Sequence, residues 1–243
     1  MRSVTRGLLT LAATTALTLS FASATAVAAP APSAASTSPS AVTPATVHSC
    51  AQNVTPGLAT CFALRRTDAG VHHSLISPDV TPSGYGPANL QSAYKLPTGA
   101  GAGQTVAIVD AQDDPNAESD LATYRSTFGL PACTTANGCF KKVNQNGAAS
   151  PLPTADAGWA GEISLDVDMV SAICANCHIL LVEATSATIA NLGAAVNRAV
   201  AMGAKYVSNS YGGPEDGTEA TDDTNFFHHP GVAVTASTGD SGF

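Results

Sequence analysis

Short apolar runs alternate with helix-forming stretches over the second half of the chain, and this alternation limits the possible folds more than any other feature. The runs are rich in β-branched residues and bounded by turn-forming residues, which is typical of buried strands. Buried strands that are separated by helices form a parallel sheet with helices packed on it. We therefore expect an α/β fold. The expected strands are 105–110, 178–184, 205–210 and 232–237, and the expected helices are 117–128, 159–174 and 189–202.

Polar residues lie at or just beyond the carboxyl ends of three expected strands, namely Asp110, Ser210 and Asp240. Parallel sheets bind ligands at this edge, so all three are candidate site residues by position. Asp110 also stands where subtilisins place their triad aspartate. The chain has no His-Gly-Thr-His segment to partner it, so a histidine-based subtilisin is not expected. Asp110 is then expected either to order the site or to cap the following helix.

The expected helix 159–174 carries two acids on a face that should be buried. Glu162 and Asp166 are four residues apart, so they lie one turn apart and about 40° from each other around the axis. Apolar residues occupy most of the remaining circumference, which indicates a buried helix. Two buried carboxyls so close together should share a proton, which favours a functional pair over a solvated acidic stripe. Asp168 lies about 240° from Glu162 and is expected to face solvent or cap a loop.

The N-terminus is expected to direct export. Residues 1–29 have an early positive charge, an apolar run and small residues before residue 29, as in a signal peptide. The run is too short and too often interrupted for a transmembrane helix, which is the alternative interpretation. Residues 30–47 are rich in Ala, Pro, Ser and Thr, carry no Asp, Glu, Lys or Arg, and are expected to be a linker. We therefore expect a secreted, extracellular protein with no membrane association after cleavage.

An even number of cysteines in an exported chain favours disulfides. The six cysteines lie as three close pairs, and local pairing is the preferred hypothesis among the 15 connectivities that six cysteines allow. The candidate pairs are Cys50 with Cys61, Cys133 with Cys139, and Cys174 with Cys177.

The segment Cys174–His178 also matches the Cys-x-x-Cys-His motif that attaches c-type haem. This is a remote alternative, because His178 opens an apolar strand and cytochromes c are usually helical. A disulfide at the turn from helix to strand is the preferred interpretation.

Composition and histidine spacing limit other functions. The 18 Asp and Glu exceed the 10 Lys and Arg, which argues against a nucleic-acid partner. The pairs His72–His73 and His228–His229 could bind a metal, but adjacent histidines rarely point at one ion, so we expect loop histidines and no metal site.

Four segments, in this order, resemble the sedolisins, serine-carboxyl peptidases with a subtilisin-like fold. "GYGPANLQSAYKL" resembles the start of their mature domain, and "GEISLD" resembles their Glu-x-x-x-Asp helix. "VSNSYGG" resembles the end of their substrate-lining strand, and "ASTGDSG" resembles the segment with their oxyanion-hole aspartate. The resemblance covers residues 84–243. It implies a subtilisin-like parallel sheet flanked by helices.

The resemblance also implies roles for individual residues. Glu162 would be the general base, Asp166 would orient it and tune its charge, and Asp240 would donate a hydrogen bond at the oxyanion hole. Substrate would bind as a strand along Ser210, Tyr211 and Gly212. "GDSG" also occurs around the nucleophile of trypsin-like proteases, but those are nearly all β. Ser241 is therefore expected to be a turn residue.

The chain departs from the family in two respects. It has no Gly-Thr-Ser motif for the nucleophile, and the calcium site of the family, also near its C-terminus, is missing with it. We therefore expect an N-terminal portion of the catalytic domain, truncated before its C-terminal part, with calcium possible only in a full-length form and no other cofactor. Residues 48–83 are expected to be a short pro-segment or N-terminal extension, in place of the long propeptide of the family.

The expected function is that of a secreted serine-type endopeptidase that cleaves peptides at acid pH through a Ser-Glu-Asp triad. Without the nucleophile, the chain as written is expected to be inactive. The expected partners are peptide or protein substrates, and the expected state is a monomer. A non-catalytic secreted protein that still binds peptides is the alternative.

Overall fold

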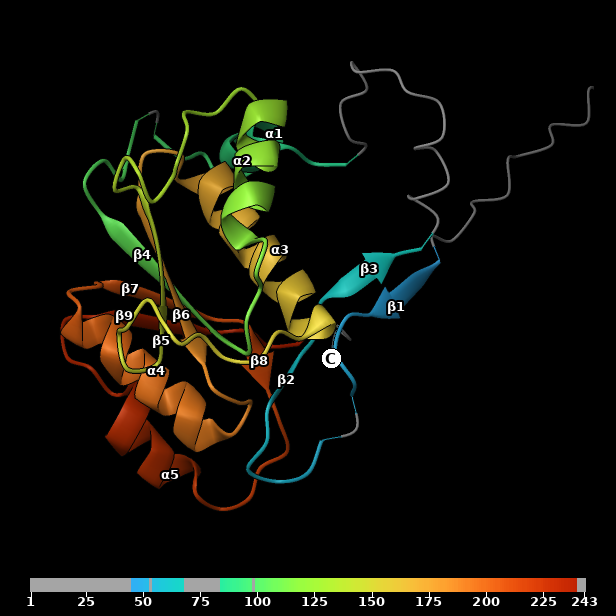
Figure 1. Ribbon diagram of the computed structural model, residues 1–243, viewed down its shortest axis with the longest axis vertical. Helices are drawn as coiled ribbons and strands as arrows, with labels where there is room; N and C mark the ends of the chain where they lie inside the picture. The colour runs from blue at the N-terminus through green and yellow to red at the C-terminus, as the bar shows by residue number, and fades with distance from the viewer. Residues whose placement is uncertain (1–44, 53, 68–83, 98, 240–243) are drawn as a thin grey trace, which may run out of the picture. The chain divides into compact units, whose positions relative to one another are not determined.

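The computed structural model of the protein describes residues 45–52, 54–67, 84–97 and 99–239, all of which belong to one compact unit (Figure 1). The predicted signal peptide and the linker up to residue 44 lie outside the described residues. So do Asp240, Ser241 and His72–His73. In the described part of the chain, no helix is long and apolar enough to cross a membrane.

A five-stranded parallel sheet is the centre of the fold, which confirms the predicted α/β class. The strand order is β5-β6-β4-β7-β9, so the first strand of the predicted series, β4, lies in the middle. Its register brings Asp110 beside Glu183 and Val109 beside both Val182 and Asn209. The strands are β4 Thr105–Ala111, β5 Phe140–Asn144, β6 His178–Ala184, β7 Tyr206–Asn209 and β9 Ala233–Ala236.

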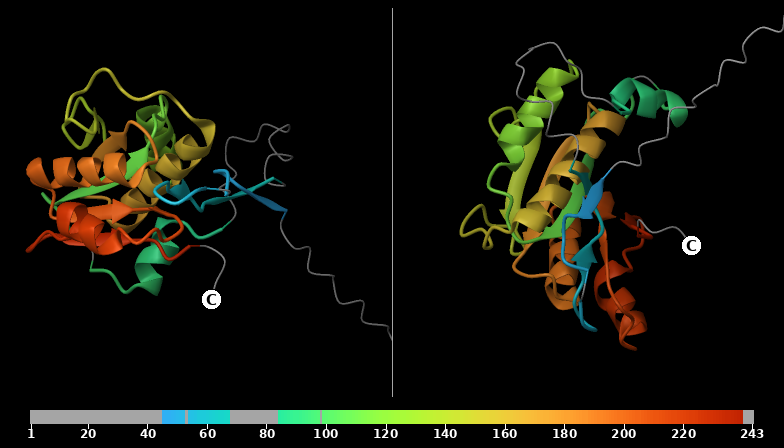
Figure 2. Two further views of the ribbon diagram at one scale, coloured as in Figure 1. Left: turned by 90° about the horizontal axis from the view of Figure 1, so that it is seen from below. Right: turned by 90° about the vertical axis from the view of Figure 1, so that its right-hand side faces the viewer.

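Helices cover both faces of this sheet (Figure 2). Successive residues of β4 point to opposite faces. Ile108 packs with Ile163 of α3 (Ala157–Ile173) and with Leu121 of α2 (Ala117–Thr127). Val109 belongs to the other core, with Leu192 of α4 (Ile189–Ala201). Both cores are closed to solvent, because all of these side chains are buried.

The two longest helices begin at side-chain caps. Asp156 accepts hydrogen bonds from the backbone N–H groups of Gly158 and Trp159 and starts α3 two residues before the predicted position. Thr188 accepts from the N–H of Asn191 at the start of α4. These contacts satisfy N–H groups that have no partner within the helix.

Strand β5 was not predicted, because its sequence does not look like a buried strand. Phe140 and Val143 are buried, but Lys141 and Lys142 lie between them. β5 is an edge strand, paired only with β6, and lysines are common on such strands. Other elements without a specific prediction are α1 Pro87–Ala93, α5 Glu219–Asp222 and the short helix η2 Asp223–Phe227.

The segment before residue 68 packs against the α/β unit through three short strands. β1 (Thr46–His48), which includes the last two residues of the predicted linker, pairs with β3 (Leu64–Arg66). β2 (Thr60–Cys61) instead pairs antiparallel with β8 (Tyr211–Gly212), which directly follows the central sheet strand β7. In Figure 1, β2 accordingly lies beside β8.

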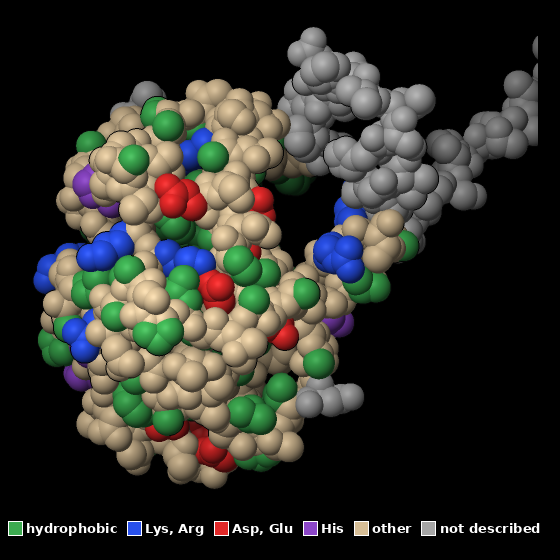
Figure 3. Space-filling model, viewed as in Figure 1, with side chains coloured by type: hydrophobic (Ala, Val, Ile, Leu, Met, Phe, Trp, Pro, Cys, Tyr) green, Lys and Arg blue, Asp and Glu red, His purple; other side chains and the backbone are tan. Residues whose placement is uncertain are grey.

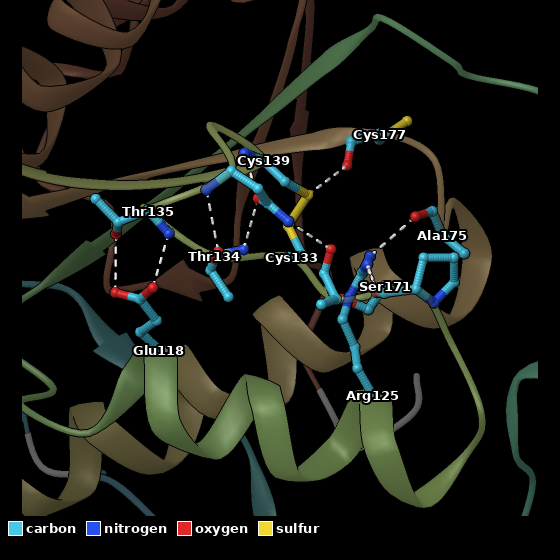
Figure 4. The surroundings of a disulfide bond; sticks show 12 residues. Glu118, Arg125, Cys133, Thr134, Thr135, Cys139, Ser171, Ala175 and Cys177 are labelled. Carbon is cyan, nitrogen blue, oxygen red and sulfur yellow. Dashed lines mark hydrogen bonds between the residues drawn. A yellow bond between two sulfur atoms is a disulfide. The ribbon is translucent and has the colours of Figure 1, made fainter.

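All three predicted local disulfides are confirmed: Cys50–Cys61, Cys133–Cys139 and Cys174–Cys177. Figure 4 shows the second of these between α2 and β5, near Glu118, which accepts two hydrogen bonds from Thr135. The sulfurs of the Cys-x-x-Cys-His motif are bonded to each other, so neither is available for a thioether bond to haem.

Candidate active site

The acid pair of α3 faces one cleft. Glu162 is buried, with 4% of its surface exposed, and Asp166 lies one turn further along the same helix. Asp166 Oδ1 accepts a hydrogen bond of 2.9 Å from the hydroxyl of Ser210, which follows β7. The structure therefore brings together Glu162, Asp166 and Ser210, three of the six residues that the sequence singled out for catalysis or substrate binding.

The cleft beside the pair is lined partly by residues that sequence reasoning did not select. Leu165 and Met169 of α3, Phe62 and Ala63 of the N-terminal segment, and Ser237 after β9 line it together with the acids. Leu165 is 43% exposed, although the apolar circumference of the helix predicts that it is buried. The apolar side chains of α3 thus cover the core and one wall of the cleft.

Burial gives Asp166 an unusual affinity for protons. Loss of solvent raises the pKa of its carboxyl to about 6, and the hydrogen bond from Ser210 opposes this rise. Its second oxygen, Oδ2, is buried and has no hydrogen-bond partner in the described part of the chain. A carboxyl in this environment keeps its proton at acid pH.

Asp110 lies beneath the pair at the end of β4. Its side chain is fully buried, and within the described residues neither carboxyl oxygen has a hydrogen-bond partner. Burial raises the pKa of Asp110 well above its usual range, and the nearby charges of Asp166, Glu162 and Glu183 raise it further. The N-cap position of the following helix α2 is Asn116, so Asp110 does not cap it. Of its two predicted roles, ordering the site agrees with this position.

A second buried acid, Glu183, lies beside Asp110 on the neighbouring strand. Glu183 of β6 accepts a hydrogen bond from the backbone N–H of Asp114 and lies 3.5 Å from the ammonium of Lys142. Burial is the main cause that raises the pKa of Glu183 to about 8, although Lys142 lowers it. Lys142 also contacts Asp113 at 2.5 Å. The positive charge of Lys142 therefore partly compensates the negative charges of Asp113 and Glu183.

The residues predicted to bind substrate, Ser210, Tyr211 and Gly212, are buried or partly buried and are held by contacts from below. The hydroxyl of Tyr211 donates a 2.7 Å hydrogen bond to Asn209, whose amide donates to the carbonyl of Thr235. The ring of Tyr211 also meets Trp159 edge-on, with 6.5 Å between centroids. These contacts fix β8, and β2 of the same chain occupies its pairing edge.

The backbone of the N-terminal segment reaches the acid pair itself. The N–H of Ala63 donates a 3.1 Å hydrogen bond to Oε2 of Glu162. Ala63 comes two residues after Cys61, which is the partner of Tyr211 in the β2–β8 pairing. Apart from the position of Cys61, no sequence pattern indicates this contact, because a backbone N–H occurs at nearly every residue.

The other candidates lie elsewhere. Asp168, expected to face solvent, is half-buried, and burial, with a smaller contribution from Asp120, raises its pKa to about 7. His228 and His229 lie after η2, with His229 bonded to the carbonyl of Phe226. The described residues contain no group of three or more His, Cys, Asp or Glu side chains arranged to hold a metal. Lys and Arg side chains are interspersed with Asp and Glu over the face in Figure 3.

No family model matches the sequence. The chain is similar to kumamolisin of Bacillus sp. (strain MN-32), with 32% identity over 192 residues that make up 74% of this chain and 33% of kumamolisin. It thus spans about a third of the length of this curated relative. Among solved structures, it is similar to a Pseudomonas sedolisin, a serine-carboxyl proteinase complexed with two molecules of pseudo-iodotyrostatin. The TM-score is 0.46 and the identity 23%, over 58% of this chain and 39% of that one.

The similarity to kumamolisin extends over most of the chain. The structure adds a parallel sheet and a helix that carries a Glu-x-x-x-Asp pair, with Glu162 buried and Asp166 partly buried. The similarity to kumamolisin, over a third of the length of that relative, thus supports the sedolisin family for this chain.

Proposed function

We propose that the described domain provides the base and the substrate-binding edge of a serine-carboxyl endopeptidase that cleaves peptides at acid pH. The hydrogen bond from the Ala63 N–H to Glu162 carries this proposal. Ala63 comes two residues after Cys61 of β2, the strand that pairs with β8. Glu162 therefore contacts a backbone amide nitrogen of an extended segment that lies along this edge.

This position suits Glu162 for both proton transfers of acyl transfer. As a carboxylate it accepts the proton of a serine hydroxyl that attacks the peptide carbonyl. It then donates this proton to the nitrogen of the leaving amine, which is the kind of atom that it contacts at Ala63. The serine itself is not assigned to any described residue.

Asp166 and Asp110 support this role by holding protons. Below about pH 6, Asp166 keeps its proton, so Glu162 can carry the negative charge without a second charge one turn away. Asp110, buried and raised in pKa, stays neutral under the same conditions. A carboxylate base of this kind works near its own pKa, which gives acid rather than neutral activity.

The proposed substrates are extended peptides, paired along Ser210, Tyr211 and Gly212. Asp240 is proposed to donate a hydrogen bond to the developing oxyanion, a role that requires its protonated form. Export is proposed from the predicted signal peptide, and three disulfides are consistent with an oxidising compartment.

Glu162→Gln tests the proposal in the longest polypeptide that the gene encodes. We expect hydrolysis of an unstructured protein substrate at acid pH to fall by at least about 100-fold, because glutamine cannot accept the proton. Glu118→Gln is the matched control, since Glu118 is remote from the cleft and only holds Thr135. Equal loss in both variants, or undiminished activity in Glu162→Gln, contradicts the proposal.

A non-catalytic peptide-binding protein is the second candidate, favoured by the strand already paired on β8. It predicts peptide binding without hydrolysis in every encoded form. In that case neither the wild type nor Glu162→Gln hydrolyses peptides, and the substitution changes only the affinity for peptide.

A further inference from the structure

A disulfide closes the N-terminal segment into a ring immediately before the cleft. Cys50 and Cys61 are 11 positions apart and joined to each other, and Cys61 belongs to β2, which pairs with β8. The ring is braced internally: the amide of Gln52 donates to the carbonyls of both cysteines, and the Thr60 hydroxyl donates to the carbonyl of Ala51.

Four residues of the segment around β2 are as buried as the core of the domain, whereas Leu58 and Phe62 are partly buried. Ala59, Thr60, Cys61 and Ala63 are each at most 6% exposed. Cys50 and Cys61 belong to the same hydrophobic cluster as Trp159 and Tyr211. The pairing edge of β8 is therefore covered by β2, whose Cys61 belongs to the hydrophobic core.

Backbone hydrogen bonds fix the segment on both sides of β2. The N–H of Ala59 donates to the carbonyl of Ala187, and the N–H of Ile189 donates to the carbonyl of Gly57. At the other end, Ala63 donates to Glu162 and its carbonyl accepts from the N–H of Ser49. The segment is thus held from the start of α4 to the acid pair, and Phe62 and Ala63 at its far end line the cleft.

Glycines on the domain make room for this close approach. A Cβ at Gly213 would lie 2.3 Å from the carbonyl oxygen of Leu58, and a Cβ at Gly158 would lie 2.6 Å from that of Ser49. Real Cβ atoms do not come so close to backbone oxygen. A side chain larger than glycine at position 213 or 158 would therefore clash with the backbone of the segment.

We propose that the ring closed by Cys50–Cys61 is a lock that keeps the strand β2 of the chain itself in the peptide-binding cleft, so that opening this one disulfide frees the β8 edge. The inference rests on the proposed function, because it takes this edge as the site of peptide binding. A disulfide lowers the conformational entropy of the segment when it is released from the domain. It adds no new contact in the docked state. For a ring of this size, loop-closure entropy predicts about a 100-fold shift toward the docked state.

The double variant Cys50→Ser/Cys61→Ser of the full chain tests the lock, with Cys133→Ser/Cys139→Ser as control for the loss of a local disulfide elsewhere. Hydrogen exchange measures release of the segment without any need for catalysis. We expect the Ala59 and Ala63 amides to exchange about 100-fold faster in the first variant and at the wild-type rate in the control. Unchanged protection, or equal acceleration in both, overturns the proposal.

A labelled peptide of residues 58–64 with Ser in place of Cys61 separates this proposal from the proposed function. It should bind the Cys50→Ser/Cys61→Ser variant about 100-fold more tightly than wild type, because the edge is free. Equal tight binding to both overturns the lock but leaves the cleft as a peptide site. Faster exchange without peptide binding supports the lock and contradicts the proposed function.

Reduction of the wild-type chain provides a second measurement if the double variant does not fold. Dithiothreitol converts the disulfide to two thiols and is itself oxidised to a cyclic disulfide. Cys61 is fully buried, so Cys50–Cys61 should react only when the segment leaves the cleft. We expect Gly213→Ala, which displaces Leu58, to speed reduction of this disulfide at least about 10-fold and to leave Cys174–Cys177 unaffected. Equal rates in wild type and Gly213→Ala overturn the proposal.

Discussion

Replacing Asp166 with asparagine should remove one source of pH-dependent stability. Asparagine has the shape of the protonated acid, and its side-chain oxygen can still accept the hydrogen bond from Ser210. The variant therefore resembles the wild-type protein with a proton fixed at this position. Any difference between the two proteins that changes with pH then reports the ionisation of Asp166.

The sign and size follow from the raised pKa of Asp166, which is about 6 in the folded protein against an ordinary 3.8. At and below pH 3.8 the proton is bound in both states, and the contribution to stability is fully present. As pH rises toward 6, the unfolded chain ionises first, so the free energy of unfolding of wild type falls. A shift of about 2 pKa units corresponds to about 3 kcal/mol. Asp166→Asn does not undergo this loss.

Urea unfolding between about pH 4 and pH 7 measures this effect, and the fluorescence of the single tryptophan, Trp159, beside Tyr211 reports it. We expect Asp166→Asn to gain about 3 kcal/mol relative to wild type over this range. Asp223→Asn, at an exposed position, should show no such change. A difference between Asp166→Asn and wild type that stays constant with pH, or that grows toward acid pH, would refute the reasoning.

Two further predictions concern stability away from the acid pair. Lys142→Ala should lower the free energy of unfolding at neutral pH by about 3 kcal/mol, because Asp113 and Glu183 lose their cation, whereas Lys141→Ala, on the exposed face of β5, should change it by less than about 0.5 kcal/mol. Equal effects in urea unfolding would contradict this. Gly101→Ala should cost about 1 to 3 kcal/mol more than Gly99→Ala. Both glycines have positive φ, but only at Gly101 would a Cβ meet the sulfurs of Cys174 and Cys177. Equal melting temperatures of the two variants would show that the contact is relieved at no cost.

The alternation of strands and helices predicted the central fold because each element carries its own signal. Four of the five sheet strands are β-branched apolar runs, and they were placed to within one or two residues. β5 was missed because Lys141 and Lys142 interrupt its apolar residues at the sheet edge. The side-chain period identified Glu162 and Asp166 as neighbours, since a fixed helical geometry relates positions four apart.

Contacts between distant segments could not be predicted in the same way. The Ala63 N–H meets Glu162 across 99 positions of sequence, and no side chain marks it. The exposure of Leu165 depends on which side of α3 is left open by its neighbours. Such features depend on tertiary packing. The proximity of Glu162 and Asp166, in contrast, follows from local helix geometry alone.

The dependence of kcat/KM on pH for peptide hydrolysis, in the longest form that the gene encodes, tests most directly whether a carboxyl pair performs the chemistry. Asp166 loses its proton at about pH 6, so we predict highest activity below that pH and a steady fall above it. Activity that instead rises through about pH 7, as for a histidine base, would contradict the assignment of Glu162 and Asp166.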